Sequence, residues 1–152
     1  MENLGSLAVL LAFAIAVYAT AASVAGRVWR KPHLALSAER AVYAVFALVT
    51  LASAILVWAL MTGDFRMAYV AAHSNRAMPA LYKFAAWWGG QEGSLLFWTF
   101  LLSGYTAIVV FTNRRRHREM MPWVTATLSA ISAFFLLMNS FAVNPFRVLA
   151  VD

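Results

Sequence analysis

The most informative stretch of this chain is Trp87-Trp88-Gly89-Gly90-Gln91-Glu92-Gly93-Ser94-Leu95-Leu96-Phe97-Trp98. It holds three of the six tryptophans and three of the seven glycines, and it leads into a long apolar segment. Tryptophan is enriched where a membrane meets water, and glycine lets another group approach the backbone closely. A plain membrane span needs neither three glycines nor Gln-Glu at its entrance. This stretch, the glycine–tryptophan corner, therefore predicts a membrane span with another group fitted against its start.

The composition is that of an integral membrane protein. Of the 152 residues, 63% are hydrophobic and 12% are charged, whereas soluble domains are about 45–50% apolar and about 25% charged. Four segments without Lys, Arg, Asp or Glu are long enough to cross about 30 Å of hydrocarbon as helices, namely 4–25, 41–61, 94–112 and 123–143. The alternating pattern of a membrane barrel is absent. We expect an all-α integral membrane protein that forms a single transmembrane module over residues 1–152.

The basic residues predict how the spans are oriented. Eight of the twelve Lys and Arg residues lie in the two connections that follow the first and third spans. The positive-inside rule places these connections in the cytoplasm, so both termini are expected outside the plasma membrane. The same bias explains the net charge of +6 and the pI near 10.3. The arginine run is therefore weak evidence for nucleic-acid binding, and we expect a lipid bilayer and no nucleic acid around this chain.

The outer loop 62–93 is too long for a turn and remains apolar and aromatic. Its stretch 80–88 follows Pro79, and proline suits the start of a helix. One helical face of this stretch carries three large apolar side chains, Leu81, Phe84 and Trp88. We expect a short helix lying in the membrane interface, ended by the Gly-Gly pair.

His73 lies in the outer loop within the polar stretch 69–75. Its imidazole is able to ligate a metal or a haem iron, or to form a hydrogen bond with Ser74 or a backbone carbonyl. The loop contains no second histidine and the chain contains no cysteine. We favour the hydrogen bond, and we expect no metal site.

Glu92 and the tryptophans each have two interpretations. A carboxylate at the start of a span complements the helix dipole, or it anchors a ligand or handles a proton. The tryptophans form an aromatic belt, or with the glycine backbone they form a wall for a planar ligand such as a porphyrin or quinone. The candidate residues of a ligand or partner cleft are Trp87, Trp88, Gly89, Gly90, Gln91, Glu92, Gly93, Trp98 and His73. No catalytic set is present: there is no P-loop, nucleophile elbow or pair of carboxylates.

Two features inside the spans predict helix packing. Asn139 is the only amide within the four apolar segments, and we expect it to bond to a neighbouring helix. Small residues on the third and fourth spans permit close helix approach, namely Ser94, Ser103, Gly104, Ser129 and Ser132.

Three runs of sequence carry a resemblance to a known family. They are the run 64–75 followed by Met78-Pro79 and Leu81-Tyr82-Lys83, the run 88–98, and the run 140–146 ending in Asn144-Pro145-Phe146. These runs resemble the CcmF/NrfE family over essentially the whole chain. The members of that family are the large membrane subunits of the bacterial cytochrome c maturation system.

The resemblance implies a role in haem attachment. The complete subunit of such a family joins the vinyl groups of haem b to the two thiols of a Cys-x-x-Cys-His motif in apocytochrome c, at the outer face of the plasma membrane. The implied partners are the rest of the haem lyase, a haem chaperone, apocytochrome c and the subunits that reduce and present its thiols. The absence of cysteine fits, because the thiols belong to the substrate.

The chain also departs from the family pattern. The tryptophan-rich haem-handling segment and the haem-ligating histidines of longer members are missing, so none of the three histidines is assigned as a haem ligand. We expect the amino-terminal module of a haem lyase, as a fragment or a separately encoded piece. Two alternatives stay open: a module that binds or moves haem or quinol, and a non-catalytic assembly scaffold.

Overall fold

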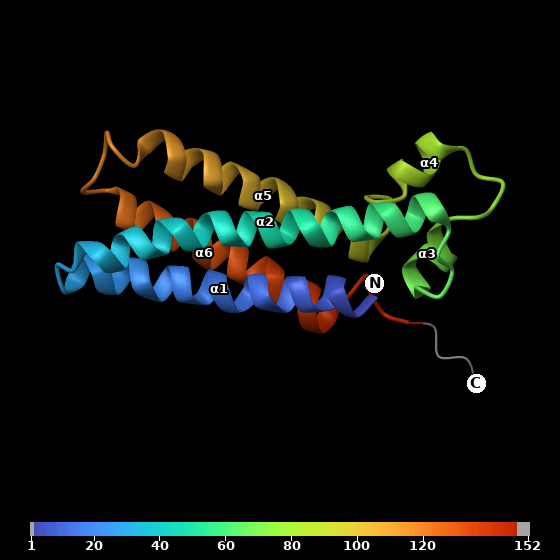
Figure 1. The fold of residues 1–152 in the computed structure, drawn as a ribbon, viewed down its shortest axis with the longest axis horizontal. Helices are drawn as coiled ribbons and strands as arrows, with labels where there is room; N and C mark the ends of the chain where they lie inside the picture. The colour runs from blue at the N-terminus through green and yellow to red at the C-terminus, as the bar shows by residue number, and fades with distance from the viewer. Residues whose placement is uncertain (1, 149–152) are drawn as a thin grey trace.

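Four long helices lie side by side in an elongated bundle, and two short helices cover one end of it (Figure 1). The computed structural model describes residues 2–148. The long helices are α1 (Glu2–Val28), α2 (Pro32–Thr62), α5 (Gln91–Asn113) and α6 (Met121–Leu137), and the short ones are α3 (Ala68–His73) and α4 (Ala80–Ala85). A π-helix, η1 (Met138–Ala142), continues α6. The four long segments are apolar and long enough to span a membrane, which confirms the predicted all-α membrane fold.

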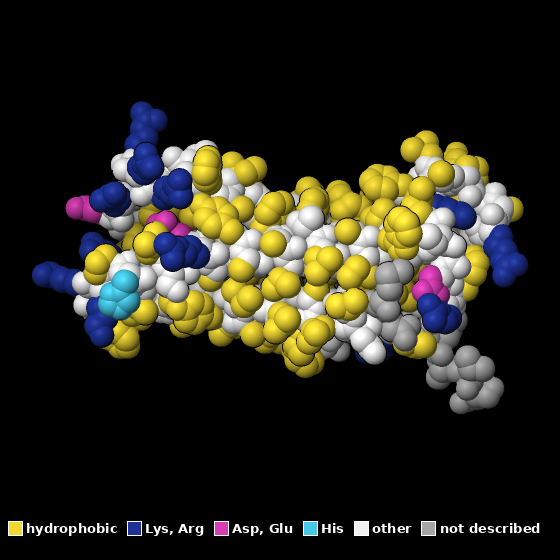
Figure 2. Space-filling view, viewed as in Figure 1, with side chains coloured by type: hydrophobic (Ala, Val, Ile, Leu, Met, Phe, Trp, Pro, Cys, Tyr) yellow, Lys and Arg dark blue, Asp and Glu magenta, His cyan; other side chains and the backbone are white. Residues whose placement is uncertain are grey.

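The two ends of the bundle differ in charge. The α1–α2 and α5–α6 connections lie together at one end, where Lys and Arg gather (Figure 2); we call this the basic end. Helices α3 and α4 lie at the other end, the corner end. The chain after η1 returns there as well, since the Ala68 N–H donates to the Arg147 carbonyl at 2.9 Å. A Cβ added at Gly5 would overlap the ring of Phe146, so this returning segment closes onto the start of α1.

Small side chains fill the centre of the bundle. Helix α1 packs against α2 and α6, and α5 packs against the same two helices, so the four form a closed ring. Helix α1 turns a row of buried alanines inward, Ala8, Ala12, Ala16 and Ala19. Its large apolar side chains are exposed instead, among them Leu4, Leu7, Leu10 and Leu11. Without a hydrophobic driving force between helices in lipid, small residues at the contact let the backbones approach closely.

Helix α2 extends well beyond the expected span 41–61. It begins at Pro32, continues through the charged pair Glu39-Arg40, and runs for 31 residues. At 1.5 Å per residue it is about 46 Å long, more than the roughly 30 Å of a hydrocarbon core. Charged side chains at the headgroup level do not break a helix, and proline is favoured in its first turn. Hydropathy therefore locates the part of α2 within the lipid and misses its first turns.

The π-helix that follows α6 contains a buried polar side chain that contacts α5. Asn139 is buried, and its side-chain amide donates to Thr99 Oγ1 of α5 at 2.9 Å. This is the expected bond to a neighbouring helix. Among the small residues of the spans, Ser103, Ser129 and Ser132 are also buried within this chain. They pack the four helices against each other rather than against a partner.

The connection between α2 and α5 contains more structure than the sequence indicated. Gly63 ends α2 with a left-handed φ of 70°, a conformation that glycine adopts without strain. Helix α3 follows, within the stretch expected only to be polar. The expected interfacial helix is α4, which ends at Ala85, and the chain passes through turns before α5 begins. Leu81 remains 76% exposed, so its face meets lipid or a partner rather than this bundle.

Candidate functional site

Tyr69 is the centre of the glycine–tryptophan corner. It lies on α3, is only 4% exposed, and reaches across to the turn that precedes α5. Its hydroxyl donates to the Ala86 carbonyl at 2.7 Å and accepts from the Gly90 N–H at 3.1 Å. Burial raises the pKa of this phenol above its ordinary value of 10.0, against the lowering effect of the Gly90 N–H. One neutral hydroxyl thus joins α3 to both sides of the Gly-Gly turn.

Gly90 and Gly93 are needed for this contact. A Cβ at Gly90 would overlap the imidazole of His73, and a Cβ at Gly93 would overlap the Tyr69 hydroxyl and the Trp87 carbonyl. Gly89 differs, because a Cβ there would make only ordinary contacts of 3.4 Å or more. The close approach that the glycines predicted is therefore made, at Gly90 and Gly93, by side chains of this same chain.

His73 is part of the same cluster. Its ring stacks on Tyr69 with centroids 4.3 Å apart, and Nδ1 lies 3.0 Å from the Tyr69 carbonyl oxygen. A carbonyl only accepts, so Nδ1 carries the proton and Nε2 faces Gly90. This contact is the backbone hydrogen bond weighed earlier against a metal or haem role. Within residues 2–148, no three His, Cys, Asp or Glu side chains gather as a metal site would require.

The two adjacent tryptophans of the corner have different surroundings. Trp87 is 7% exposed and packs edge-on against Phe97 at 5.0 Å, with Phe100 at 5.6 Å. Trp88 is 43% exposed and lies beside Phe84 and Phe97. Trp87 is therefore a structural anchor of the corner, whereas Trp88 presents an aromatic face outward.

The first turns of α5 present the remaining candidates. Gln91 is exposed and Glu92 is half-buried in the first turn, where a carboxylate complements the helix dipole. The Ser94 hydroxyl donates to the Trp88 carbonyl at 2.6 Å, which fixes the Trp88 backbone to the helix start. Trp98 is 60% exposed one turn further along. Trp88, Gln91 and Trp98 thus remain free to meet a ligand or another protein, with Glu92 partly accessible between them.

The structure divides the predicted site into two groups. His73, Trp87, Gly90 and Gly93 are brought together around Tyr69, and they hold the corner in shape. Trp88, Gly89, Gln91 and Trp98 face outward. Tyr69 was not among the predicted site residues. Its spacing of four residues from His73 is the available signal, since that spacing puts two flat rings on one side of a helix.

Known proteins resemble this chain in sequence and in fold. No protein-family model matches the sequence. The cytochrome c-type biogenesis protein CcmF of Pseudomonas aeruginosa is 40% identical over 147 residues, covering 96% of this chain and 22% of that protein. NrfE of Haemophilus influenzae and CcmF of Escherichia coli are 36% and 34% identical over 146 residues, each covering 96% of this chain and 23% of the relative.

A solved structure described as the cytochrome c haem lyase CcmF has the same fold. It superposes with a TM-score of 0.89 at 27% sequence identity, over 99% of this chain and 25% of that one. The chain thus spans about a quarter or less of the length of the relatives it matches. This chain belongs to the CcmF/NrfE family of cytochrome c-type biogenesis proteins.

Proposed function

We propose that this chain is the amino-terminal membrane module of a haem lyase that attaches haem to apocytochrome c. The observation that carries the proposal is the similarity over 99% of the chain to a structure described as a haem lyase. Haem b is then a substrate of the whole assembly. The partners are the remaining part of the lyase, a haem chaperone, apocytochrome c and the subunits that present its thiols.

The module contributes a preformed surface rather than a catalytic group. Tyr69, His73 and Gly90 keep the turn before α5 in one conformation, because the phenol satisfies backbone groups on both sides of it. That turn sets the direction of Trp88 and of the start of α5. We assign Trp88, Gln91, Glu92 and Trp98 to the face that meets haem or the rest of the lyase.

The aromatic chemistry of this face suits the proposed ligand. Exposed indole rings provide a flat apolar contact for a porphyrin or for aromatic side chains of a partner. The basic end then faces the cytoplasm of a bacterial cell, and the corner lies at the outer face of the plasma membrane. Haem attachment on that face needs no thiol from this chain, which has no cysteine.

The experiment compares two equally exposed tryptophans at the same end of the bundle. Trp98 is 60% exposed on α5 and Trp58 is 59% exposed on α2. Each is replaced by alanine in cells that contain the complete maturation machinery, and covalently bound haem in cytochrome c is measured. We expect Trp98→Ala to lower holocytochrome c and Trp58→Ala to leave it unchanged, with both variants at normal levels in the membrane.

Glu92→Gln tests the carboxylate of the same face. A loss of holocytochrome c with Glu92→Gln would assign the negative charge a role beyond the helix dipole. If Trp98→Ala and Glu92→Gln both retain full haem attachment, the assignment of this face is wrong. If deleting the whole chain leaves cytochrome c maturation intact, the proposed function itself is wrong.

A further inference from the structure

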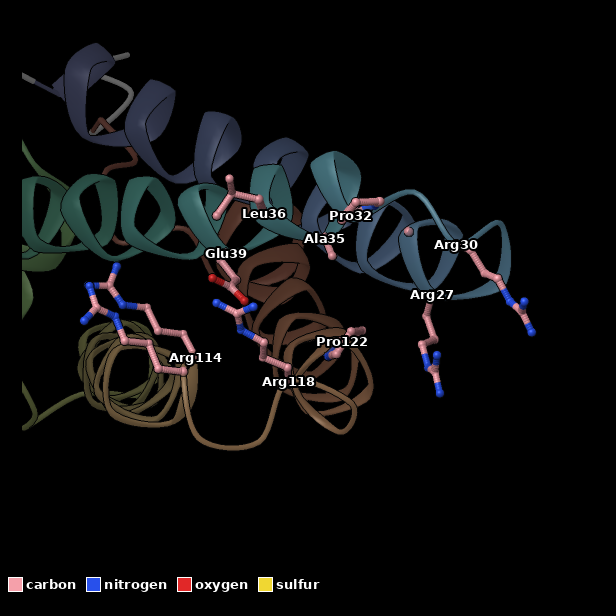
Figure 3. Close-up of a pocket in the computed structure, with 11 residues that line it drawn as sticks. Arg27, Arg30, Pro32, Ala35, Leu36, Glu39, Arg114, Arg118 and Pro122 are labelled. Carbon is pink, nitrogen blue, oxygen red and sulfur yellow. The ribbon is translucent and has the colours of Figure 1, made fainter.

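A second feature lies at the basic end, far from the corner. A cavity of about 690 Å³ opens between the end of α1, the start of α2, the end of α5 and the start of α6. It is lined by Gly26, Arg27, Arg30, Pro32, Ala35, Leu36, Glu39, Arg114, Arg115, Arg118 and Pro122. Its volume lies in the range of about 300–1,000 Å³ typical of small-molecule sites. Arg114 and Arg118 lie on the side of the cavity that Glu39 faces, whereas Arg27 and Arg30 point away from it at the opposite rim (Figure 3).

The helices that form this cavity are tied together beneath it. The Ser23 hydroxyl of α1 donates to the Pro122 carbonyl of α6 at 2.7 Å. Gly26 lies so close to α2 that an added Cβ would come within 2.7 Å of the Ala35 nitrogen. These contacts hold α1 against α2 and α6, so the cavity is part of the bundle rather than a gap between loose loops.

The charge of the cavity is strongly positive. Five arginines line it against one carboxylate. Glu39 projects from α2 toward Arg114 and Arg118 (Figure 3), but within residues 2–148 the only ion pair joins Arg66 to Asp64. Glu39 attracts Arg114 and Arg118 without forming an ion pair with either, and the Arg114 guanidinium lies over the Phe111 ring at 5.0 Å, so the cavity keeps a surplus of positive charge. Arginine forks match the geometry of phosphate oxygens.

The cavity is apolar on its other wall and lies at headgroup depth. Pro32, Ala35 and Leu36 contribute carbon surface from the first turns of α2. Trp29 and Trp123, which are 65% and 51% exposed, mark the same end of the bundle, and tryptophan belts lie at the membrane interface. A ligand with a phosphate and acyl chains would contact the arginines through its phosphate and the carbon surface of α2 through its acyl chains.

The backbone at Arg30 ends α1 and turns the chain toward α2. Arg30 has a left-handed φ of 52° at the end of α1, with the Lys31 N–H donating to the Gly26 carbonyl at 2.9 Å. Glycine is the residue that adopts this conformation without strain. The conformational cost of an arginine here is accepted within the turn that ends α1, where the Lys31 N–H satisfies a carbonyl of the helix.

We propose that this cavity binds the headgroup of an anionic phospholipid, with Arg114 and Arg118 contacting the phosphate (Figure 3). The acyl chains leave along the carbon surface of α2 into the bilayer. Basic pockets between transmembrane helices bind anionic headgroups in this way. The lipid holds the ends of α1, α2, α5 and α6 together at the basic end.

The test is native mass spectrometry of the purified chain in detergent with equal amounts of phosphatidylglycerol and phosphatidylcholine. We expect retained phosphatidylglycerol to exceed phosphatidylcholine, and Arg114→Gln with Arg118→Gln to lower its retention about fivefold for each arginine removed. Arg116→Gln is the matched control, since Arg116 belongs to the same run but does not line the cavity.

Three results would overturn the proposal. They are equal retention of the two lipids, an equal loss with Arg116→Gln, and the displacement of phosphatidylglycerol by inorganic phosphate that binds on its own. The last result would assign the cavity to a free anion. Circular dichroism and the elution volume of each variant establish that the helices are intact before lipid binding is compared.

Discussion

At the scale of single residues, Tyr69 determines the shape of the corner. Its phenol is buried and forms hydrogen bonds with backbone groups on both sides of the Gly-Gly turn. The sequence predicted that something approaches the glycines closely, and this was correct for Gly90 and Gly93. It did not identify the approaching group, because the residue spacing alone does not show that α3 folds back onto the start of α5. Whether haem or a partner meets the exposed tryptophans stays a prediction.

Tyr69→Phe should destabilise the fold by about 1–3 kcal/mol, because the Ala86 carbonyl and the Gly90 N–H lose a buried partner. The measurement is thermal unfolding in detergent, followed by circular dichroism. Tyr82→Phe is the matched control, since Tyr82 is 65% exposed and should change the unfolding temperature little. Equal effects of the two substitutions would contradict the assigned role of the phenol.

Asp64 makes the stability of the fold depend on pH. The hydrogen bonds from Arg66 hold the pKa of the Asp64 carboxyl below its ordinary value of 3.8. A lowered pKa stabilises the fold above the unfolded-state value, and this contribution is lost as the pH falls through the folded-state value. Arg66 is largely exposed, so the effect stays below about 1 kcal/mol.

The stability difference between the wild type and Asp64→Asn should therefore be present at pH 7 and shrink below about pH 3.8. Unfolding temperatures across this range measure it. If the difference in unfolding temperature between the wild type and Asp64→Asn stays constant down to the lowest pH, the ion pair is not its cause.

At the scale of elements, the four spans were predictable and their ends were not. Uncharged apolar runs mark the part of each helix that lies in hydrocarbon, and all four predicted spans correspond to helices. Helix α2 begins at Pro32, before Glu39 and Arg40, because charges outside the hydrocarbon do not limit a helix. The π-helix at Met138–Ala142 was not predictable. Its Asn139 side chain donates to Thr99 on another helix, and the local sequence of α6 does not show that contact.

Asn139 and Thr99 should be energetically coupled, because the hydrogen bond between them joins η1 to α5. A double-mutant cycle with Asn139→Leu and Thr99→Val, measured as unfolding free energy, should give about 1 kcal/mol of coupling. The same cycle with Thr127→Val in place of Thr99→Val should give none, since the Thr127 hydroxyl donates to its own helix at Trp123. Comparable coupling in both cycles would mean that the bond does not join the two elements.

At the scale of the whole molecule, the charge asymmetry of the two ends predicts the orientation in the membrane. The basic end contains the α1–α2 and α5–α6 connections, and the corner end contains α3 and α4 (Figures 1 and 2). The positive-inside rule then places the corner outside the cytoplasm. The absence of cysteine makes this orientation directly measurable, because a single introduced thiol has no background.

A membrane-impermeant maleimide applied to intact cells should label the Asn75→Cys variant and leave the Arg116→Cys variant unlabelled. Both positions are exposed, in the loop before α4 and in the α5–α6 connection. Permeabilised cells serve as the control, and there both variants should react. Labelling of Arg116→Cys alone in intact cells would reverse the proposed orientation.

The alanine row of α1 has a consequence for how the molecule assembles. Alanine has no rotamers to lose when it is buried, so α1 docks against α2 with little cost in side-chain entropy. In lipid, where dispersion contacts replace the hydrophobic effect between helices, this low cost favours the helical hairpin over its separated halves. The α1–α2 pair is thus suited to form as soon as both segments have entered the bilayer. We expect α5 and α6 to pack onto this pair and close the ring, since α5 contacts α2 and α6 contacts α1.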